Sequence, residues 1–208
     1  MAGAGASPPP GHRGRPIEDL ALFPLGTVLF PGGRLPLRIF EQRYLGMAKV
    51  CLKDNVTFGV CLIREGREVG EPAVPVEVGT LARIAEWDMP QLGVLQVVAR
   101  GEGRFRILER RVQPDGLARG RVEAIADDRD GPVPAGAARC VRLLERVIQE
   151  TPDAIAAPHR LDSASWVGMR LAELLPLAPE SKQELLEMTD AAARLDRLSG
   201  LLSRPQGV

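Results

Sequence analysis

The chain has 208 residues with 27 basic and 27 acidic side chains, so its formal net charge at pH 7 is zero. No global field therefore draws the protein toward nucleic acid or an anionic membrane, and a chain of this length can bury a hydrophobic core without disulfides or metals. Cys51, Cys61 and Cys140 are odd in number and lack a metal-binding spacing. We interpret them as buried apolar side chains rather than as a disulfide framework.

Residues 1–16 at the N-terminus are small, glycine-rich and proline-rich, with no apolar run that resembles the core of a signal peptide. We predict that they form a disordered tail. No later apolar run approaches the roughly 18 residues that a membrane-spanning helix requires. We therefore expect a cytoplasmic protein without a membrane segment.

Two short proline-punctuated apolar runs follow the tail and lead into an amphipathic helix. Residues 28–30 and 35–40 have the β-branched or aromatic content of strands, and Pro31-Gly32-Gly33 between them is typical of a turn. After Phe40 the apolar period changes from two to about 3.6, which predicts a helix. The residues of its apolar face are Phe40, Tyr44, Met47 or Ala48, and Cys51.

The middle of the chain predicts antiparallel hairpins. Residues 56–64 are a nearly continuous apolar run, as expected of a central strand, and residues 74–87 alternate around Gly79, which we interpret as a bulge or a close backbone approach. Residues 88–91 are predicted to form a hairpin tip, and residues 101–103 a second turn. The remaining predicted strands are 92–100, 104–112 and 121–126.

About seven strands result, which predicts a barrel. In the strand 104–112, a period of two places Phe105 and Ile107 on one face and Arg104 and Arg106 on the other. We expect the first pair in the core and the second pair in solvent.

A polar connector rich in proline and glycine at residues 127–136 marks a change of composition, and helices follow it. Ser163 is a predicted N-cap, and Pro179 suits the first turn of a helix. Apolar side chains recur at helical spacing and predict a packed bundle. These residues are Val141, Leu144, Val147 and Ile148; Val167, Leu171, Leu174 and Leu175; and Leu195, Leu198 and Leu202.

The predicted fold class is therefore α+β: a partly closed antiparallel β-barrel followed by a C-terminal helical bundle. The predicted division of the chain is a disordered tail at 1–16, the barrel at 17–130 and the bundle at 131–208.

An ordered set of short motifs carries a resemblance to a known family. The stretch FPLGTVLFPGGRLPLRIFEQRYLGM comes first, and residues 78–84, 101–107 and 182–187 follow in the family's order. The chain resembles the N-terminal, substrate-binding domain of Lon proteases over roughly residues 18–203. This resemblance implies a PUA-like barrel and a role in recognising protein substrates. The motif residues, which we interpret as structural, are Pro24, Leu25, Phe30, Pro31, Pro36, Phe40, Glu41, Arg43 and Tyr44.

Lon proteases combine an ATP-driven motor with a Ser-Lys dyad, and the sequence contains neither set of parts. It has no G-x-x-x-x-G-K-[ST] loop to hold phosphates. Ser181 and Lys182 are neighbours, but adjacent residues on a helix point about 100° apart and cannot act as nucleophile and base. We therefore predict a stand-alone relative of the Lon domain that is not an enzyme, needs no cofactor and binds no metal.

Trp87 and Met89, with Leu92 beyond Pro90, form the candidate peptide-binding surface, because apolar side chains near a hairpin tip have little core to cover. We predict that they bind unfolded or extended segments of other proteins, which could belong to a protease or chaperone system. The alternative is that they fold back onto the helical bundle.

Two other functions stay open on the sequence. PUA-like barrels often bind RNA, but acidic residues dilute the arginines of the barrel and aromatic stacking platforms are scarce, so we do not expect nucleic acid as the partner. An adaptor subunit that docks one fixed partner is the other alternative. The arginines in question are Arg100, Arg104, Arg106, Arg110, Arg111, Arg119 and Arg121.

Overall fold

The computed structural model describes residues 16–203, so residues 1–15 of the predicted disordered tail lie outside the described residues. Within this range the chain forms a six-stranded sheet and five α-helices. The strands are β1 (Ile17–Leu25), β2 (Arg34–Ile39), β3 (Phe58–Glu65), β4 (Val74–Gln91), β5 (Val94–Val112) and β6 (Ala118–Ala124). The helices are α1 (Gln42–Asp54), α2 (Ala138–Glu150), α3 (Ala164–Leu174), α4 (Pro179–Glu187) and α5 (Ala191–Ser203), with 3₁₀ turns at Ala135–Ala137 and Pro152–Ala154.

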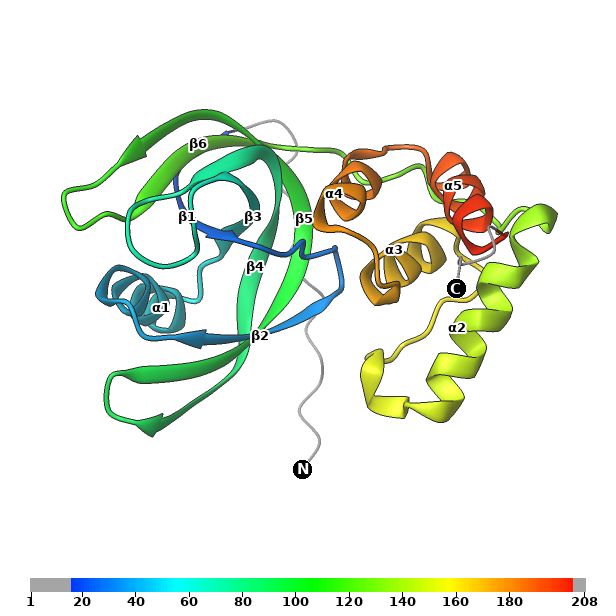
Figure 1. Ribbon diagram of the computed structural model, residues 1–208, viewed down its shortest axis with the longest axis horizontal. Helices are drawn as coiled ribbons and strands as arrows, with labels where there is room; N and C mark the ends of the chain where they lie inside the picture. Colours follow the sequence, from blue (N-terminus) through cyan, green and yellow to red (C-terminus); the bar gives the residue numbers. More distant parts are fainter. Residues whose placement is uncertain (1–15, 204–208) are drawn as a thin grey trace.

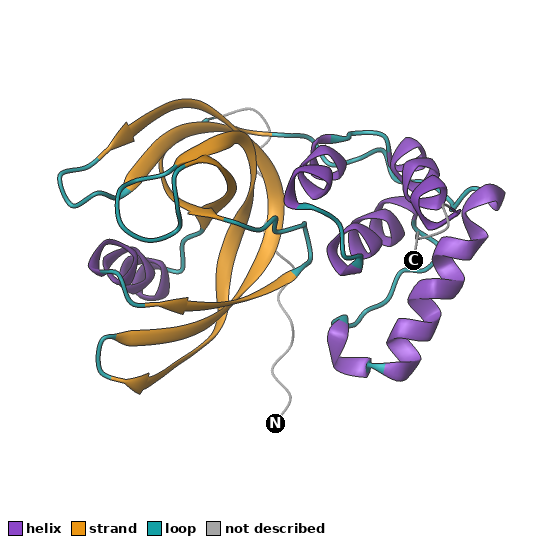
Figure 2. Ribbon diagram, in the orientation of Figure 1, coloured by secondary structure: helices purple, strands orange, loops and turns teal. Residues whose placement is uncertain are grey.

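The sheet closes into a barrel because β5 pairs with strands at two places in the strand order. That order is β2-β5-β4-β3-β1-β6, and the second half of β5 also pairs with β6. Figures 1 and 2 show the strands curving around a common interior, with α2 to α5 gathered on one side of them. The predicted α+β class is confirmed, and the closing pair agrees with a partly closed barrel.

One strand pair departs from the antiparallel pattern that the sequence predicted. β1 and β3 run parallel, from Leu22 opposite Gly59 to Leu25 opposite Leu62, whereas the other five pairings are antiparallel. Parallel neighbours need a crossover connection, because a tight turn cannot join them. Here β2 and α1 supply that crossover.

One predicted strand and one predicted turn are wrong. Residues 28–30 are not a strand but part of a loop between β1 and β2, and residues 101–103 are not a turn but the middle of the continuous strand β5. Gly101 is required not for a turn but for a close contact, because a Cβ at this position would overlap the Phe30 carbonyl oxygen. Gly101 donates its N–H to Gly33 (2.9 Å), so it allows the loop to lie directly on the strand.

The apolar face of α1 is buried as predicted, with one exception. Tyr44, Met47, Ala48 and Cys51 all contribute to the core of the barrel. Phe40 does not, because it precedes the N-cap Glu41 and is 48% exposed. The buried apolar face of α1 therefore begins at Tyr44 rather than at Phe40 as the sequence predicted.

The helix signals in the C-terminal part are confirmed. The Ser163 hydroxyl accepts the Trp166 N–H (3.0 Å) at the start of α3, and Pro179 occupies the first turn of α4. The apolar faces of α2 to α5 meet in one cluster, which also includes Val28 and Phe30 from the loop between β1 and β2. Leu174, a predicted member of this core, is exposed instead. The division at residue 130 stays a prediction, and the contacts of Val28 and Phe30 cross it.

A buried ionic cluster lies where the barrel meets the helices. Asp128, in the connector after β6, binds Arg104 of β5 (2.6 Å) and Arg194 of α5 (2.5 Å). Arg104 also donates to the carbonyl oxygens of Leu186 (2.9 Å) and Met188 (2.6 Å) at the end of α4. Cations are favoured at the C-terminal end of a helix, where carbonyl groups lack intrahelical partners.

The prediction that Arg104 faces solvent is wrong, because helices cover that face of β5. The residue is only 3% exposed, while its neighbour Phe105 is fully buried on the other face as predicted. Burial lowers the pKa of Arg104, and the adjacent Asp128 carboxylate opposes that effect. The shared carboxylate is therefore what allows two guanidinium groups to be buried together.

We predict that Asp128→Asn lowers the free energy of unfolding by about 3 kcal/mol or more, because it leaves two buried cations without their anion. Chemical denaturation followed by circular dichroism measures this change. The matched control is Glu150→Gln, which removes the exposed pair between Arg146 and Glu150 (3.2 Å) and is expected to cost less than about 1 kcal/mol. Equal losses in the two variants would contradict the role assigned to the buried cluster.

Candidate functional site

The ends of β4 and β5 form a hairpin that projects beyond the closed part of the barrel. β4 pairs with β3 only as far as Ala82 and then continues to Gln91 with β5. In Figure 1 this green hairpin extends at the lower left, away from α2 to α5 on the right. The turn lies at Leu92-Gly93, where Gly93 adopts a φ of 82°, so the predicted tip at residues 88–91 is wrong.

The three predicted surface residues are all exposed on this hairpin. The exposed fraction is 60% for Trp87, 48% for Met89 and 93% for Leu92. Trp87 and Met89 lie on the β4 arm, and Leu92 lies in the turn. The alternative in which these side chains pack on the helical bundle does not agree with this placement.

Trp87 and Met89 extend an apolar face that α1 covers elsewhere. Trp87 lies opposite Val97 in β5, and directly opposed residues of an antiparallel pair project to the same side. Val97 is buried in the cluster that contains Met47 of α1. The exposed side chains are therefore the uncovered continuation of the barrel core, and they are held on a strand rather than on a loop.

The family-motif residues at the start of α1 form a structural group. Arg43 binds the Glu41 carboxylate (2.8 Å) and lies 4.8 Å from the centre of the Tyr44 ring. Tyr44 in turn stacks on Phe23 at 4.0 Å. Burial raises the pKa of Tyr44. These contacts agree with the structural interpretation of Glu41, Arg43 and Tyr44.

Two further motif residues, Phe30 and Pro31, fix the loop between β1 and β2. Phe30 is fully buried, and the Pro31 carbonyl accepts a hydrogen bond from Arg170 of α3 (2.5 Å). On the barrel side, the Thr80 hydroxyl donates to the Leu29 carbonyl (2.6 Å). The loop is thus fixed between β4 and α3. The remaining motif residues are Pro24 and Leu25 in β1, Pro36 in the edge strand β2, and Phe40.

The barrel arginines are distributed among acidic partners. Five of the seven residues in the predicted patch take part in ion pairs, which removes the uniform positive surface that phosphate groups require. These pairs are Arg104 with Asp128, Arg106 with Glu77, Arg111 and Arg119 with Asp19, and Arg121 with Glu109. Arg110 instead donates to the Ala73 carbonyl (3.1 Å).

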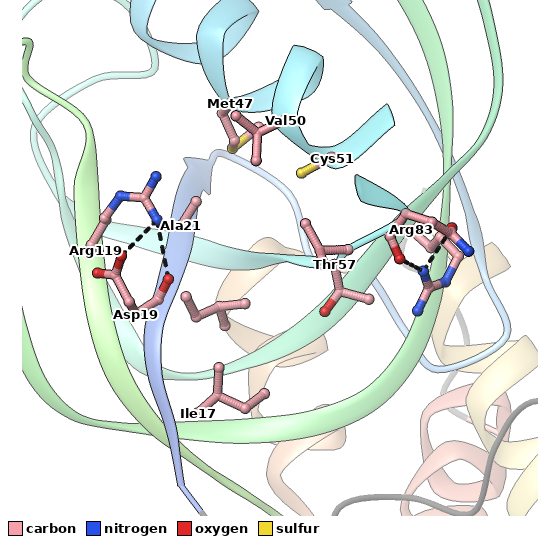
Figure 3. A pocket seen from close by; sticks show the side chains of 12 residues that line it. Ile17, Asp19, Ala21, Met47, Val50, Cys51, Thr57, Arg83 and Arg119 are labelled. Carbon is pink, nitrogen blue, oxygen red and sulfur yellow. Dashed lines mark hydrogen bonds and ion pairs between the residues drawn. The ribbon is translucent and has the colours of Figure 1, made fainter. Parts of the chain in front are cut away.

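A cleft of about 390 Å³ lies beneath α1 on the barrel wall (Figure 3). Met47 and Cys51 form part of its apolar lining, and two arginines flank it. Arg119 is bound by Asp19 (3.0 Å), and Arg83 by Glu102 (2.6 Å). Because each guanidinium group already has a carboxylate partner, the cleft offers little free charge for a ligand.

The described residues provide no metal site or reactive thiol. Across residues 16–203, no group of three or more His, Cys, Asp or Glu side chains could hold a metal ion. All three cysteines are free and buried, and burial raises the pKa of Cys61 to about 12. Nor does any helix in this part of the chain have the length and apolar content to cross a membrane.

The chain matches one protein-family model over residues 19–204, described as the ATP-dependent protease La (LON) substrate-binding domain. A Lon protease of Anaeromyxobacter dehalogenans is 31% identical, with 100% of this chain and 26% of that protein covered. Lon protease 2 of Myxococcus xanthus is 30% identical over 92% of this chain and 24% of its own length. The chain thus spans about a quarter of the length of these relatives.

The crystal structure of a Lon N-terminal domain protein from Xanthomonas campestris has the same fold. It is 39% identical, superposes with a TM-score of 0.75, and covers 91% of this chain and 100% of its own. The fold therefore places the chain among the proteins that combine this β-barrel with a helical bundle. The chain belongs to the Lon substrate-binding domain family.

Sequence reasoning found the exposed hairpin residues but missed the buried ionic cluster. Asp128 stands in a polar connector, where an acidic residue is ordinarily solvated, and Arg104 alternates with core residues as a solvent-facing residue would. No local signal distinguishes them, because helices more than 50 residues further along the chain cover them.

We predict that Trp87→Ala changes the free energy of unfolding by less than about 1 kcal/mol, because most of the indole is already in solvent. Phe105→Ala is the contrasting variant, since this ring is fully buried and its truncation is expected to cost roughly 3–5 kcal/mol. Urea denaturation of both variants beside the unmodified protein gives the comparison. A large loss for Trp87→Ala would mean that the side chain belongs to the core.

Proposed function

We propose that this protein is a non-catalytic module that binds exposed segments of other proteins through the hairpin surface of Trp87, Met89 and Leu92. The observation that carries the proposal is the exposure of these three apolar side chains on one projecting hairpin. Membership of a substrate-binding family supports polypeptide as the ligand. Unfolded or extended chains are the partners that expose the matching apolar side chains.

The physical argument concerns the cost of leaving this surface in water. A tryptophan on a strand contributes more to stability when its ring is covered, and here neither α1 nor the helical bundle covers it. Burying such an aromatic side chain on a partner contributes about 2 kcal/mol, and aromatic anchors commonly dominate an interface. The rigid strand also reduces the entropy that binding would otherwise cost.

Polypeptide fits this surface better than RNA does. Five of the seven barrel arginines are paired with carboxylates, and the neighbours of Trp87 along β4 are Asp88 and Glu86, which is bound to Arg34. The Asp88 carboxylate would repel a phosphate group, and Arg34 is already bound to Glu86. An adaptor that docks one fixed partner would use the same surface, but it would bind a single folded protein rather than many unfolded ones.

We predict that the double variant Trp87→Ala, Met89→Ala binds an unfolded model protein at least tenfold more weakly, because about 2 kcal/mol of apolar burial is lost. Reduced, carboxymethylated α-lactalbumin is the probe, and isothermal titration calorimetry measures the dissociation constant. Val69→Ala is the matched control, since Val69 is an exposed apolar residue in the loop between β3 and β4.

Unchanged binding by the double variant would exclude this surface as the binding site. Native α-lactalbumin and a short single-stranded RNA serve as competing probes at physiological salt. RNA binding whose logarithm falls steeply with the logarithm of salt concentration would favour the nucleic-acid alternative. Stoichiometric binding of one folded partner, without binding of the unfolded probe, would favour the adaptor.

We also predict that the protein neither hydrolyses ATP nor cleaves casein. The sequence has no phosphate-binding loop, and the Lys182 ammonium group donates to the Glu173 carbonyl (2.7 Å) rather than to a serine hydroxyl. Phosphate release and peptide release from labelled casein measure the two activities. Turnover above a buffer blank, lost on substitution of one residue of this chain, would refute the prediction.

A further inference from the structure

One edge of β4 lacks a partner strand over the hairpin. The last pair between β4 and β3 joins Ala82 to Phe58, whereas pairing with β5 on the other side continues to Gln91. Among the described strands, none pairs with the outer side of β4 beyond this point. Every residue from 85 to 91 is exposed. We call residues 85–89 the β4 edge.

The β4 edge differs from the other open edge of the sheet. β2 stands at the end of the strand order and pairs only with β5, but Pro36 lies at its centre and has no N–H to donate. The β4 edge contains no proline, and Pro90 follows directly after it. Apart from the Met89 N–H, which donates to Asp88, its outward-facing backbone groups can therefore hydrogen-bond to an added strand, and Pro90 limits how far that strand can pair.

The side chains of the β4 edge alternate in chemistry. Trp87 and Met89 lie on the apolar face, while Glu86 and Asp88 lie on the opposite one. Glu86 is bound to Arg34 of β2 (2.6 Å). Asp88 accepts the Met89 N–H (2.8 Å), and its exposed carboxylate could also meet a cation from outside. An added strand with apolar residues on one face and lysine or arginine on the other complements this pattern.

We propose that the β4 edge binds an extended segment of a partner polypeptide as an additional strand, a mode that rests on the proposed function and specifies its geometry. Main-chain hydrogen bonds supply affinity that does not depend on sequence, as in other proteins that bind peptides at a sheet edge. Trp87 and Met89 select apolar residues at alternate positions. Asp88 selects a basic residue between them.

The test uses backbone N-methylation of a fluorescein-labelled peptide of about seven residues that alternates isoleucine and lysine, close to the length of a typical strand. Three versions are compared by fluorescence anisotropy: one unmethylated, one methylated at the isoleucines and one methylated at the lysines. In a strand, the N–H groups of alternate residues point to the same neighbouring strand. Methylation of either the isoleucines or the lysines therefore removes the N–H groups that the peptide would donate to β4, and methylation of the other set leaves them intact. We expect the methylated version that lacks these N–H groups to bind at least tenfold more weakly than the unmethylated peptide. The other methylated version should bind within about threefold of the unmethylated peptide.

The outcomes separate this mode from the proposed function. If the unmethylated peptide binds in a Trp87-dependent manner and the two methylated versions bind equally well, strand addition is wrong and the hairpin surface stands. If neither the peptide nor the unfolded model protein binds, both proposals fail. Sedimentation that shows a dimer, which the peptide dissociates, would make a second copy of this chain the occupant and overturn the proposal.

The charge preference has its own control. Replacing the lysines of the peptide by glutamates is expected to weaken binding roughly threefold, since cross-strand charge pairs have a modest effect. Asp88→Asn should remove that preference and leave the dependence on the methylation register unchanged. Equal affinity of the lysine and glutamate peptides for the unmodified protein would overturn the role of Asp88.

Discussion

The junction between barrel and helices depends on one carboxylate shared by two buried arginines. Asp128 binds both Arg104 and Arg194, and Arg104 also satisfies carbonyl groups at the end of α4. Because uncompensated buried charges are costly, these elements must assemble together or leave the guanidinium groups unpaired. The cluster therefore joins β5, the connector, α4 and α5, which lie far apart in the sequence. It explains why the connector is ordered although its composition is that of a loop.

The loop between β1 and β2 makes a second link between the same two parts. Phe30 enters the helical cluster, while Arg170 and Thr80 hold the neighbouring carbonyl groups from opposite sides. Gly101 allows the loop backbone to approach β5 more closely than any side chain would permit. Packing thus explains several residues of the motif that suggests the family: Phe30 and Pro31 build the junction, and Arg43 and Tyr44 belong to the start of α1.

The hairpin of β4 and β5 differs from this buried junction, because its apolar side chains are exposed. Its strands continue beyond Phe58, the first residue of β3. A register shift between Ile84 and Glu86 places Trp87 opposite the buried Val97, but Trp87 itself is left exposed. A surface of this kind combines fixed geometry with exposed apolar area and an unpaired backbone edge. Each of these properties favours an extended polypeptide, because a flexible loop would lose entropy on binding and a paired strand would offer no hydrogen bonds.

The sequence by itself determined the features that depend on neighbouring residues. Ser163 and Pro179 mark helix starts because caps act within one turn, and the periods of two and 3.6 identified most strands and helices. It also indicated the family and the three apolar residues of the hairpin. Only the tertiary structure decided that β1 and β3 are parallel, that Arg104 is buried and that Trp87 is exposed. Each of these depends on which distant segment covers a residue, and neither local propensity nor periodicity carries that information.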